Sequence, residues 1–198
     1  MWRPKTTMGR PKGPRVRLIA GQWRGRLLAF PAEPGLRPTP DRVRETLFNW
    51  LDPWLAGARC LDLFAGSGAL GFEALSRGAA AATLVDCNPA VVAALRENRE
   101  RLGAEALIVA SGAQDYLAGQ GPAAFDICFL DPPYASRLLT DALTTVLTQR
   151  ILKVAGLIYI ESAVADRFEL PAGLRWHRRG QAGLVAFGLA ALAPEDRP

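Results

Sequence analysis

The sequence predicts an α/β protein with a mostly parallel seven-stranded sheet, helices on both faces, a C-terminal antiparallel hairpin and a small N-terminal β-hairpin extension. Three observations predict this fold class. Short apolar segments alternate with helical patterns from residue 59 onward, as in sheets covered on both sides. A glycine-rich turn lies between the first apolar segment and the first helical pattern. Two late apolar segments have no helix between them and would pair with each other.

The front of the chain predicts two segments outside this sheet. Residues 1–15 are rich in proline, glycine and cations and contain no acid. Such a segment buries little apolar surface, so we expect a disordered basic tail. In residues 16–36, apolar runs flank Gly21–Gly25, which predicts a β-hairpin with Trp23 at its tip.

A helix is expected near the start of the main domain, residues 37–192. Thr39 is a suitable N-cap, and Pro40 suits the first helical position. Asp41 would face the positive end of the helix dipole. Apolar residues follow at helical spacing, so one face of this helix should be buried.

The alternating region that follows can be assigned element by element. Strands are expected at Cys60–Phe64, Thr83–Asp86, Leu107–Ala110, Asp126–Leu130 and Leu157–Glu161, and helices at Ala69–Arg77, Pro89–Leu102 and Arg137–Leu147. The late strands, Leu174–Arg178 and Leu184–Leu189, are expected to form a hairpin whose loop holds Gly180 and Gly183. Residues 193–198 are expected to be a frayed tail.

The composition indicates one globular domain, since the 198 residues are 49% hydrophobic and 22% charged. Cys60, Cys87 and Cys128 are well separated and His177 is the single histidine, which argues against a metal site or a disulfide framework. We expect all three cysteines to be buried, in a reducing compartment. The longest apolar window, residues 78–85, is too short to cross a membrane, and no signal peptide is evident. A cytoplasmic protein is expected.

The net charge of +5 is unevenly distributed. Residues 1–46 hold 11 Lys/Arg and 3 Asp/Glu, a balance of +8, whereas the remaining residues carry −3. This asymmetry suggests a polyanionic partner, most simply nucleic acid. A solvated tail that aids solubility is the alternative.

The glycine-rich turn predicts a nucleotide-type ligand. Gly66, Gly68 and Gly71 satisfy G-x-G-x-x-G between a strand and a helix, and Asp86 closes the second strand 20 residues after the first glycine. An acid at that place can accept both hydroxyls of a ribose. The pattern alone fits NAD, FAD or S-adenosylmethionine.

Asp62 favours S-adenosylmethionine among these ligands. It lies in the first apolar strand, four residues before Gly66, where a pyrophosphate would be repelled and an ammonium or sulfonium attracted. The alternative is a buried acid that caps backbone amides. After the third strand, the small residues of Ser111-Gly112-Ala113 suit close packing on an adenine, although a helix N-cap at Ser111 is equally compatible.

The stretch FLDPPYA predicts chemistry on a base amine where the fourth strand ends. Asp131 and the Pro132 carbonyl would accept from the two N–H bonds of an exocyclic amine and direct its lone pair. Tyr134 would stack on the base, and the two prolines would stiffen the loop. The base would have to be flipped out or lie in a loop. A plain strand stop would explain the prolines but not the acid and the aromatic.

The chain resembles a known family in these motifs. LDLFAGSGALGFEALSRGA with FLDPPY resembles the class I methyltransferases with a Rossmann-like fold, and RLIAGQWRGRLLAF with LRPTPDRVRETLFNWL resembles the RsmD family over roughly residues 15–190. The resemblance implies methylation of the 2-amino group of a guanine, guanine 966, in 16S ribosomal RNA. It also implies S-adenosyl-L-methionine as cofactor and a substrate within the 30S subunit or a late assembly intermediate. The chain would act as a monomer, without a metal or a membrane.

The predicted site residues follow from these arguments together. Cofactor contacts are assigned to Asp62, Phe64, Gly66, Ser67, Gly68, Asp86, Cys87, Gly112, Ala113 and Asp131, and catalysis to Asp131, Pro132 and Tyr134. RNA contacts are assigned to Arg15, Arg17, Trp23, Arg24, Arg26, Arg37 and Arg42. The late hairpin loop, Arg178–Gly183, is less charged than expected for an RNA-facing element.

Three other functions share some of these sequence features. A DNA adenine-N6 methyltransferase also uses a DPPY-type tip, but nothing here resembles a separate DNA-reading domain. An NAD-dependent oxidoreductase leaves Asp62 and the DPPY stretch unexplained. A non-catalytic RNA-binding protein is disfavoured because the expected catalytic tip is intact.

Overall fold

The computed structural model describes residues 13–33, 38–133 and 137–193. The predictions made for residues 1–12, for Arg37, for Tyr134 and for the tail from residue 194 onward lie outside these residues.

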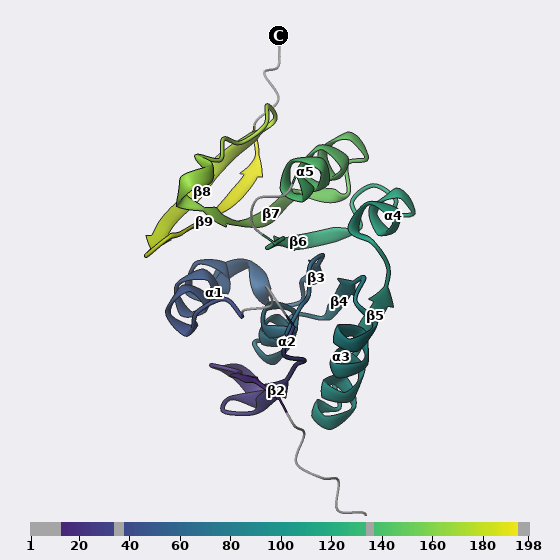
Figure 1. Cartoon of the computed structure of the whole chain (residues 1–198). Helices are drawn as coiled ribbons and strands as arrows, with labels where there is room; N and C mark the ends of the chain where they lie inside the picture. Colours follow the sequence, from purple (N-terminus) through teal and green to yellow (C-terminus); the bar gives the residue numbers. More distant parts are fainter. Residues whose placement is uncertain (1–12, 34–37, 134–136, 194–198) are drawn as a thin grey trace, which may run out of the picture.

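One sheet organises the described chain, with strand order β5-β4-β3-β6-β7-β9-β8 (Figure 1). Its strands are β3 (Arg59–Asp62), β4 (Ala81–Asp86), β5 (Ala106–Ala110), β6 (Phe125–Leu130), β7 (Leu152–Ala163), β8 (Leu174–Ala182) and β9 (Val185–Leu192). The pairs from β5 to β7 are parallel, and β9 pairs antiparallel with both β7 and β8. The predicted fold class is confirmed.

Helices cover both faces of the sheet (Figure 1). The helices are α1 (Asp41–Leu55), α2 (Ala69–Ser76) and α3 (Pro89–Leu102) on one face, and α4 (Ala113–Ala118) and α5 (Leu138–Thr148) on the other. Each face has its own hydrophobic core. Phe129 and Tyr159 pack into the core on the α1 side, whereas Leu130 and Ile160 pack into the core on the α5 side. Burial on both faces explains why the central strands are continuously apolar rather than alternating.

The expected N-cap at Thr39 is wrong. Pro40 is the N-cap of α1, with φ −54° and ψ 145°, and no side chain caps this helix end. The Thr39 hydroxyl instead donates a hydrogen bond to Asp131, with 3.1 Å between Oγ1 and Oδ2. A threonine before a proline has the local chemistry of a cap, but a contact across the molecule uses its hydroxyl.

Several other elements differ from their predicted form. The helix α4 had no predicted range beyond a possible N-cap at Ser111, because its six residues are too few to show a helical period. The late strands are longer than expected, so Gly180 lies within β8 opposite Phe187 and not in the loop. Gly183, with φ 58°, is in the turn as expected. Cys87 is exposed, not buried, because it follows the last residue of β4 at the sheet edge.

The N-terminal hairpin is present as a separate two-stranded sheet. The strands β1 (Arg15–Arg17) and β2 (Leu27–Ala29) pair antiparallel, with the 3-10 helix η1 (Gly21–Trp23) between them. The hairpin packs near α2 and α3 (Figure 1). Among the described residues, no helix has both the length and the apolar character needed to cross a bilayer.

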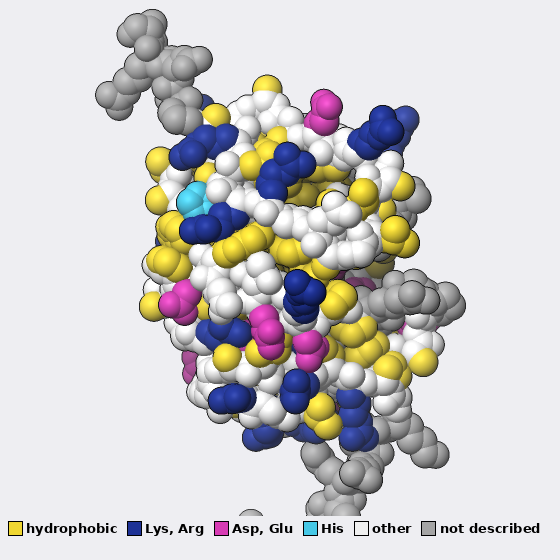
Figure 2. Space-filling model, turned by 90° about the vertical axis from the view of Figure 1, so that its left-hand side faces the viewer, with side chains coloured by type: hydrophobic (Ala, Val, Ile, Leu, Met, Phe, Trp, Pro, Cys, Tyr) yellow, Lys and Arg dark blue, Asp and Glu magenta, His cyan; other side chains and the backbone are white. Residues whose placement is uncertain are grey.

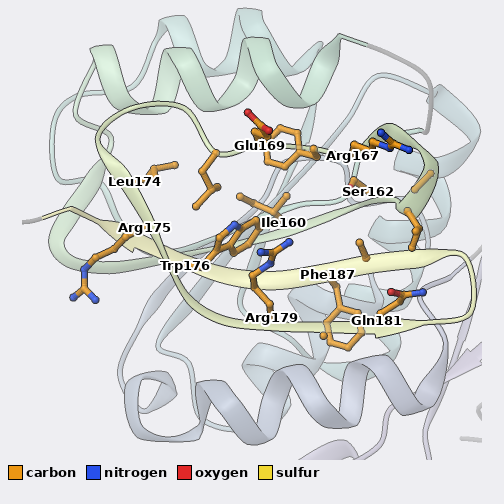
Figure 3. A pocket seen from close by; sticks show the side chains of 16 residues that line it. Ile160, Ser162, Arg167, Glu169, Leu174, Arg175, Trp176, Arg179, Gln181 and Phe187 are labelled. Carbon is orange, nitrogen blue, oxygen red and sulfur yellow. The ribbon is translucent and has the colours of Figure 1, made fainter.

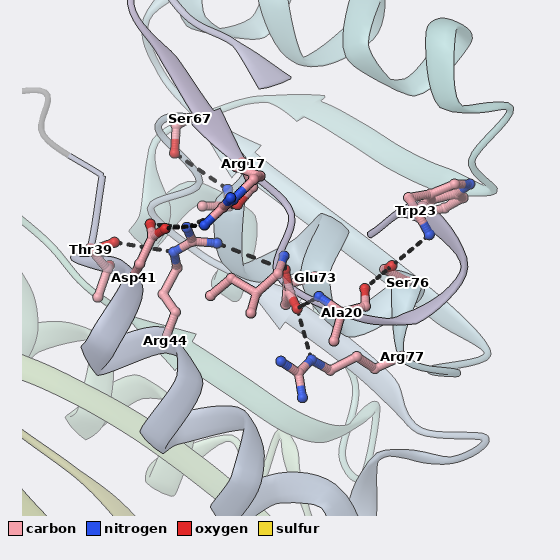
Figure 4. Close-up of polar contacts among 12 residues, drawn as sticks. Arg17, Ala20, Trp23, Thr39, Asp41, Arg44, Ser67, Glu73, Ser76 and Arg77 are labelled. Atoms are coloured by element: carbon pink, nitrogen blue, oxygen red, sulfur yellow. Dashed lines mark hydrogen bonds and ion pairs between the residues drawn. The ribbon is translucent and has the colours of Figure 1, made fainter. Parts of the chain in front are cut away.

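Buried polar side chains of α2 and α3 hold the hairpin by its backbone. Asn98 accepts from the Ala29 amide at 3.1 Å and donates to the Ala29 carbonyl at 2.7 Å. Glu73 accepts from the amides of Ile19 and Ala20 at 2.7 and 2.9 Å (Figure 4). Because buried polar groups left unpaired are costly, these contacts specify where the hairpin docks.

Candidate active site

The predicted site residues gather at one edge of the sheet, beyond the carboxyl ends of β3, β4, β5 and β6. The chain runs from β3 to β4 on one side, and β6 then pairs with the other side of β3. In open α/β sheets, ligands bind at this kind of topological switch point. The strand that ends in Asp-Pro-Pro, β6, therefore lies directly beside β3, which leads into the glycine turn.

The glycine turn joins β3 to α2. Gly66 and Gly68 have φ values of 49° and 75°, a left-handed backbone that glycine adopts without strain. Gly71 has a packing role, because a Cβ there would lie 2.8 Å from Leu84 Cγ on β4. The third glycine therefore lets α2 pack directly on the sheet, and the first two let the chain turn at the ligand edge.

Asp86 ties the glycine turn to the end of β4. Its Oδ2 accepts from the Gly66 amide at 3.0 Å, and its Oδ1 accepts from the Asn88 amide at 2.9 Å. A carboxylate offers about four lone-pair sites, so this side chain retains acceptor capacity for ribose hydroxyls. The residue is partly exposed, as a ligand contact requires.

Asp62 is a buried acid at the end of β3, only 2% exposed. Its Oδ2 accepts from the Gly71 amide at 2.9 Å, so this acid does cap a backbone amide, as the alternative interpretation of the sequence predicts. Burial raises the pKa of Asp62 to about 7, the Gly71 hydrogen bond opposes this, and the Asp86 charge adds to it. This carboxyl therefore releases its proton at a higher pH than an ordinary aspartate does.

The remaining predicted cofactor residues lie at the same edge. Ser67 is buried within the glycine turn, and Phe64 is half-buried against the core on the α5 side. Cys87 is exposed directly after β4. Gly112 is the N-cap of α4 and Ala113 its first residue, so the cap is one residue later than the Ser111 considered from sequence.

Asp131 directly follows β6 and is partly buried. Burial and the neighbouring charge of Glu161 raise its pKa well above the usual range of an aspartate, the Thr39 hydrogen bond lowers it, and Asp62 adds a smaller upward shift. The structure thus brings together Asp131 and Asp62, which the sequence assigned to catalysis and to the cofactor. Pro132 is buried and Pro133 is exposed, while Tyr134 lies outside the described residues.

Sequence reasoning missed Glu161, an acid next to Asp131. Leu130 on β6 pairs with Ile160 on β7, so the residues that follow them, Asp131 and Glu161, lie at the same level of the sheet. Glu161 is 3% exposed and accepts from the Tyr159 hydroxyl at 2.8 Å. The signal was available, because Glu161 ends an apolar run in the same way as Asp131.

A second missed residue, Arg44, links the hairpin to the site (Figure 4). Its side chain is fully buried. The Arg44 guanidinium donates to the carbonyl of Thr39 at 3.1 Å and to the carbonyl of Arg17 at 2.9 Å, and it pairs with Asp41 at 2.7 Å. Together with the Thr39–Asp131 hydrogen bond, these contacts connect β1 to Asp131. The sequence does contain a signal for this residue, because Arg44 stands at the spacing of the apolar residues that form the buried face of the helix.

The predicted RNA contacts lie mainly on the surface. Arg15, Arg17, Arg24, Arg26 and Arg42 are exposed, and Arg37 lies outside the described residues. Trp23 is half-buried and packs against the core, and its backbone amide donates to the Ser76 hydroxyl at 3.0 Å. It is therefore not a freely exposed side chain at the end of the hairpin. Figure 2 shows Lys and Arg side chains gathered at the lower edge of this face, over the N-terminal hairpin.

Comparison with known proteins matches most of the chain to one family. The family model described as "Conserved hypothetical protein 95" matches residues 16–190. Ribosomal RNA small subunit methyltransferase D of Escherichia coli strain K12 is 49% identical over 176 residues, which cover 88% of each chain. The protein of the same name from Haemophilus influenzae is 40% identical over 178 residues, covering 88% of this chain and 92% of the relative.

Solved structures agree with this match. The yhhF protein of Escherichia coli superposes with a TM-score of 0.81 at 47% identity, over 90% of this chain and 98% of the other. A Thermus thermophilus 16S rRNA N2 G1207 methyltransferase in complex with AdoMet and guanosine superposes with a TM-score of 0.68 over 91% of this chain and 50% of the other. At 18% identity, the latter shows a shared fold alone.

Proposed function

The chain belongs to the family of ribosomal RNA small subunit methyltransferase D, and we propose that it methylates the exocyclic N2 amine of a guanine in 16S ribosomal RNA. It is a methyltransferase that uses S-adenosyl-L-methionine, and ribosomal RNA is its substrate class. The guanine, its N2 amine and the assembled small subunit as substrate are the finer parts of the proposal. Family membership removes the oxidoreductase alternative.

The residues at the sheet edge fit this cofactor. The turn at Gly66 and Gly68 lets a ligand approach bare backbone, and the spare acceptor capacity of Asp86 suits a ribose. A pyrophosphate would face the nearby carboxyl of Asp62, whereas an ammonium group is attracted to it. When bound, the cofactor supplies an electrophilic methyl carbon.

Asp131 is the residue that we assign to the target amine. Thr39 occupies its Oδ2, which leaves Oδ1 as an acceptor, and the Pro132 carbonyl supplies a second acceptor. Two acceptors on the N–H bonds orient the lone pair of an otherwise poor nucleophile. After methylation, the nitrogen holds one proton too many. The raised pKa of Asp131 suits it to take that proton.

The observation that carries the proposal is the placement of Asp131. A hydrogen bond from Thr39 fixes the orientation of its carboxyl group. Asp131 follows β6, which pairs with β3, the strand that carries Asp62 and leads into the glycine turn. Positioning and charge stabilisation at the reacting atom are the main sources of rate in a reaction without a covalent enzyme intermediate.

The test replaces Asp131 by asparagine, which keeps the shape but removes the charge. With small ribosomal subunits from cells that lack the modification and a labelled methyl donor, Asp131→Asn should lower single-turnover methylation by about 100-fold or more. Cofactor affinity, measured by calorimetry, should change little. The control is Asp126→Asn, at the start of the same strand and paired with Lys153 at 2.8 Å, which should methylate normally. A near-normal rate for Asp131→Asn would contradict the assignment.

The form of the substrate needs its own test. We propose the 30S subunit or a late assembly intermediate as substrate and a monomer as the active form, because one chain supplies every site residue assigned above. Naked 16S ribosomal RNA and small subunits should be methylated at clearly different rates, with the subunits preferred. Mapping of the methyl group to a position other than a guanine N2 would refute the finer proposal, and sedimentation during turnover would test the monomer.

A further inference from the structure

A hollow of about 590 Å³ lies on the α5 side of the sheet, between β7, β8, β9 and the segment 164–170 (Figure 3). Its volume is in the range of sites that hold small ligands. None of the residues assigned above to cofactor binding or catalysis lines it. It is therefore separate from the site described above.

A β-bulge builds the floor of this hollow. Trp176 pairs with Ala190 and Arg178 pairs with Leu189, so one extra residue is inserted in β8 between them. In a regular strand, Trp176 and Arg179 would point to opposite faces because they are three residues apart. The bulge brings them to one face, as bulges often do near functional sites (Figure 3).

Trp176 and Arg179 form a flat cationic platform. The Arg179 guanidinium carbon lies 5.2 Å from the centroid of the Trp176 ring. Gly188 makes room for the ring, since a Cβ there would come within 2.7 Å of Trp176 Cζ3. Single-stranded RNA bases stack on aromatic rings and on guanidinium planes, so this platform has the chemistry of a base-stacking surface.

The charge of the hollow suits a polyanion. Arg167, Arg175 and Arg179 line it, against the single acid Glu169. Within the described part of the chain, no ion pair neutralises Arg167 or Arg179. Figure 2 shows a hollow with a hydrophobic floor among Lys and Arg side chains in the upper part of the face, over the C-terminal hairpin.

The hollow begins one strand away from Asp131. Ile160 and Ser162 of β7 line it, and Glu161 between them points to the opposite face, where it influences Asp131. Because Ile160 pairs with Leu130, the near wall of the hollow is level with the end of β6. The hollow and Asp131 thus lie near the same edge of the sheet but on opposite faces, so an RNA strand that reaches both would pass around the carboxyl end of β7.

We propose that this hollow binds a single-stranded nucleotide of the RNA substrate that flanks the target base. The inference rests on the proposed function and extends it by assigning an RNA contact to the C-terminal hairpin. The base stacks on the Trp176–Arg179 platform, and Arg167 and Arg179 contact its phosphates. The RNA would thus be held on both sides of the reacting base.

Two neighbouring arginines make a matched test. Arg179→Glu removes the platform, whereas Arg178→Glu makes the same change of charge on the opposite face of β8, next to Leu189 of the other core. Binding of a fluorescent single-stranded RNA of roughly ten nucleotides is measured by anisotropy, and methylation of small subunits by single turnover. Arg179→Glu should weaken RNA binding and raise the half-saturating subunit concentration about tenfold, with an unchanged maximal rate. Arg178→Glu should change the RNA affinity and the half-saturating subunit concentration by less than about twofold each.

The outcomes separate this inference from the proposed function. If Arg178→Glu and Arg179→Glu weaken RNA binding equally, the loss reflects the net charge of the protein, and the proposed binding site is wrong. The proposal is also wrong if Arg179→Glu has no effect on RNA binding. Arg167→Glu, on another wall, should reproduce the loss if the site exists, and thermal melting checks that each exposed substitution leaves the fold intact. If the wild-type protein failed to methylate subunits, the proposed function would fall. The RNA-binding difference between the two arginine variants would still decide whether the hollow binds RNA.

Discussion

Replacing Thr39 by valine should move the pH dependence of methylation. Valine keeps the volume of Thr39 but removes the hydroxyl that donates to Asp131 at 3.1 Å. This hydrogen bond lowers the pKa of Asp131, against burial and the charges of Glu161 and Asp62. Without it the pKa rises further, so a larger share of Asp131 is protonated at a given pH. The acidic limb of the rate profile should therefore move to higher pH.

The magnitude follows from the energy of one hydrogen bond to a charged group, about 1.5–3 kcal/mol. Because Asp131 is only partly buried, solvent screening favours the lower end of this range. A loss of about 1.5 kcal/mol corresponds to roughly a tenfold lower rate in the acidic range. The deficit should shrink as the pH rises and Asp131 becomes charged in the variant as well.

The assay is single-turnover methylation of small subunits at several pH values, with cofactor affinity measured in parallel. Thr39→Ser keeps a hydroxyl and should restore the wild-type profile. Thr39→Val should stay folded, with a melting temperature lowered by no more than about 5 °C, since one hydrogen bond but no side-chain cap of α1 is lost. Superimposable profiles for Thr39→Val and the wild type would refute the role given to this hydroxyl.

Two further predictions concern stability. The pKa of Asp62, raised from 3.8 to about 7, means that the folded state retains a proton that the unfolded state releases between these pH values. The free energy of unfolding should therefore fall between about pH 4 and pH 7, by up to about 4 kcal/mol more than in Asp62→Asn. Denaturant titrations measure this free energy for both proteins. A difference between the two proteins that stays constant with pH would contradict the prediction. Gly71→Ala should destabilise the protein by about 1–3 kcal/mol, because its Cβ would lie 2.8 Å from the buried Leu84 side chain. A Cβ at Gly121 would have no atom within 4 Å, so Gly121→Ala should leave the free energy of unfolding nearly unchanged in the same assay. Equal losses of stability in Gly71→Ala and Gly121→Ala would exclude the packing explanation.

Local patterns predicted the central part of the fold closely. The helix α3 spans Pro89–Leu102 as expected, because Asn88 caps it and Gly103 ends it in a left-handed conformation. The strand β6 was expected to within one residue, since an apolar run ends at an acid and two prolines. Signals of this kind lie within the element itself, and no distant contact is needed to interpret them.

Elements whose form depends on distant contacts were predicted less well. The strand β7 is longer than the apolar run Leu157–Glu161, because pairing with β6 and β9 extends it into less apolar residues. The bulge in β8 carries no recognisable sequence signal, although it decides which face Trp176 and Arg179 share. Gly180 has the composition of a turn but lies in a strand, where it makes room for Phe187.

The sequence by itself determined the chemistry that this edge of the sheet offers: the glycine turn, the acids at the strand ends and the Asp-Pro-Pro motif. Each is a short stretch whose function depends on its own spacing and on the period of the strand before it. Only the tertiary structure decided the partners of those groups. Thr39 and Asp131 are 92 residues apart, and Glu161 comes level with Asp131 only through the register of two parallel strands. Strand order and register depend on the whole sheet, so no local pattern could specify these contacts.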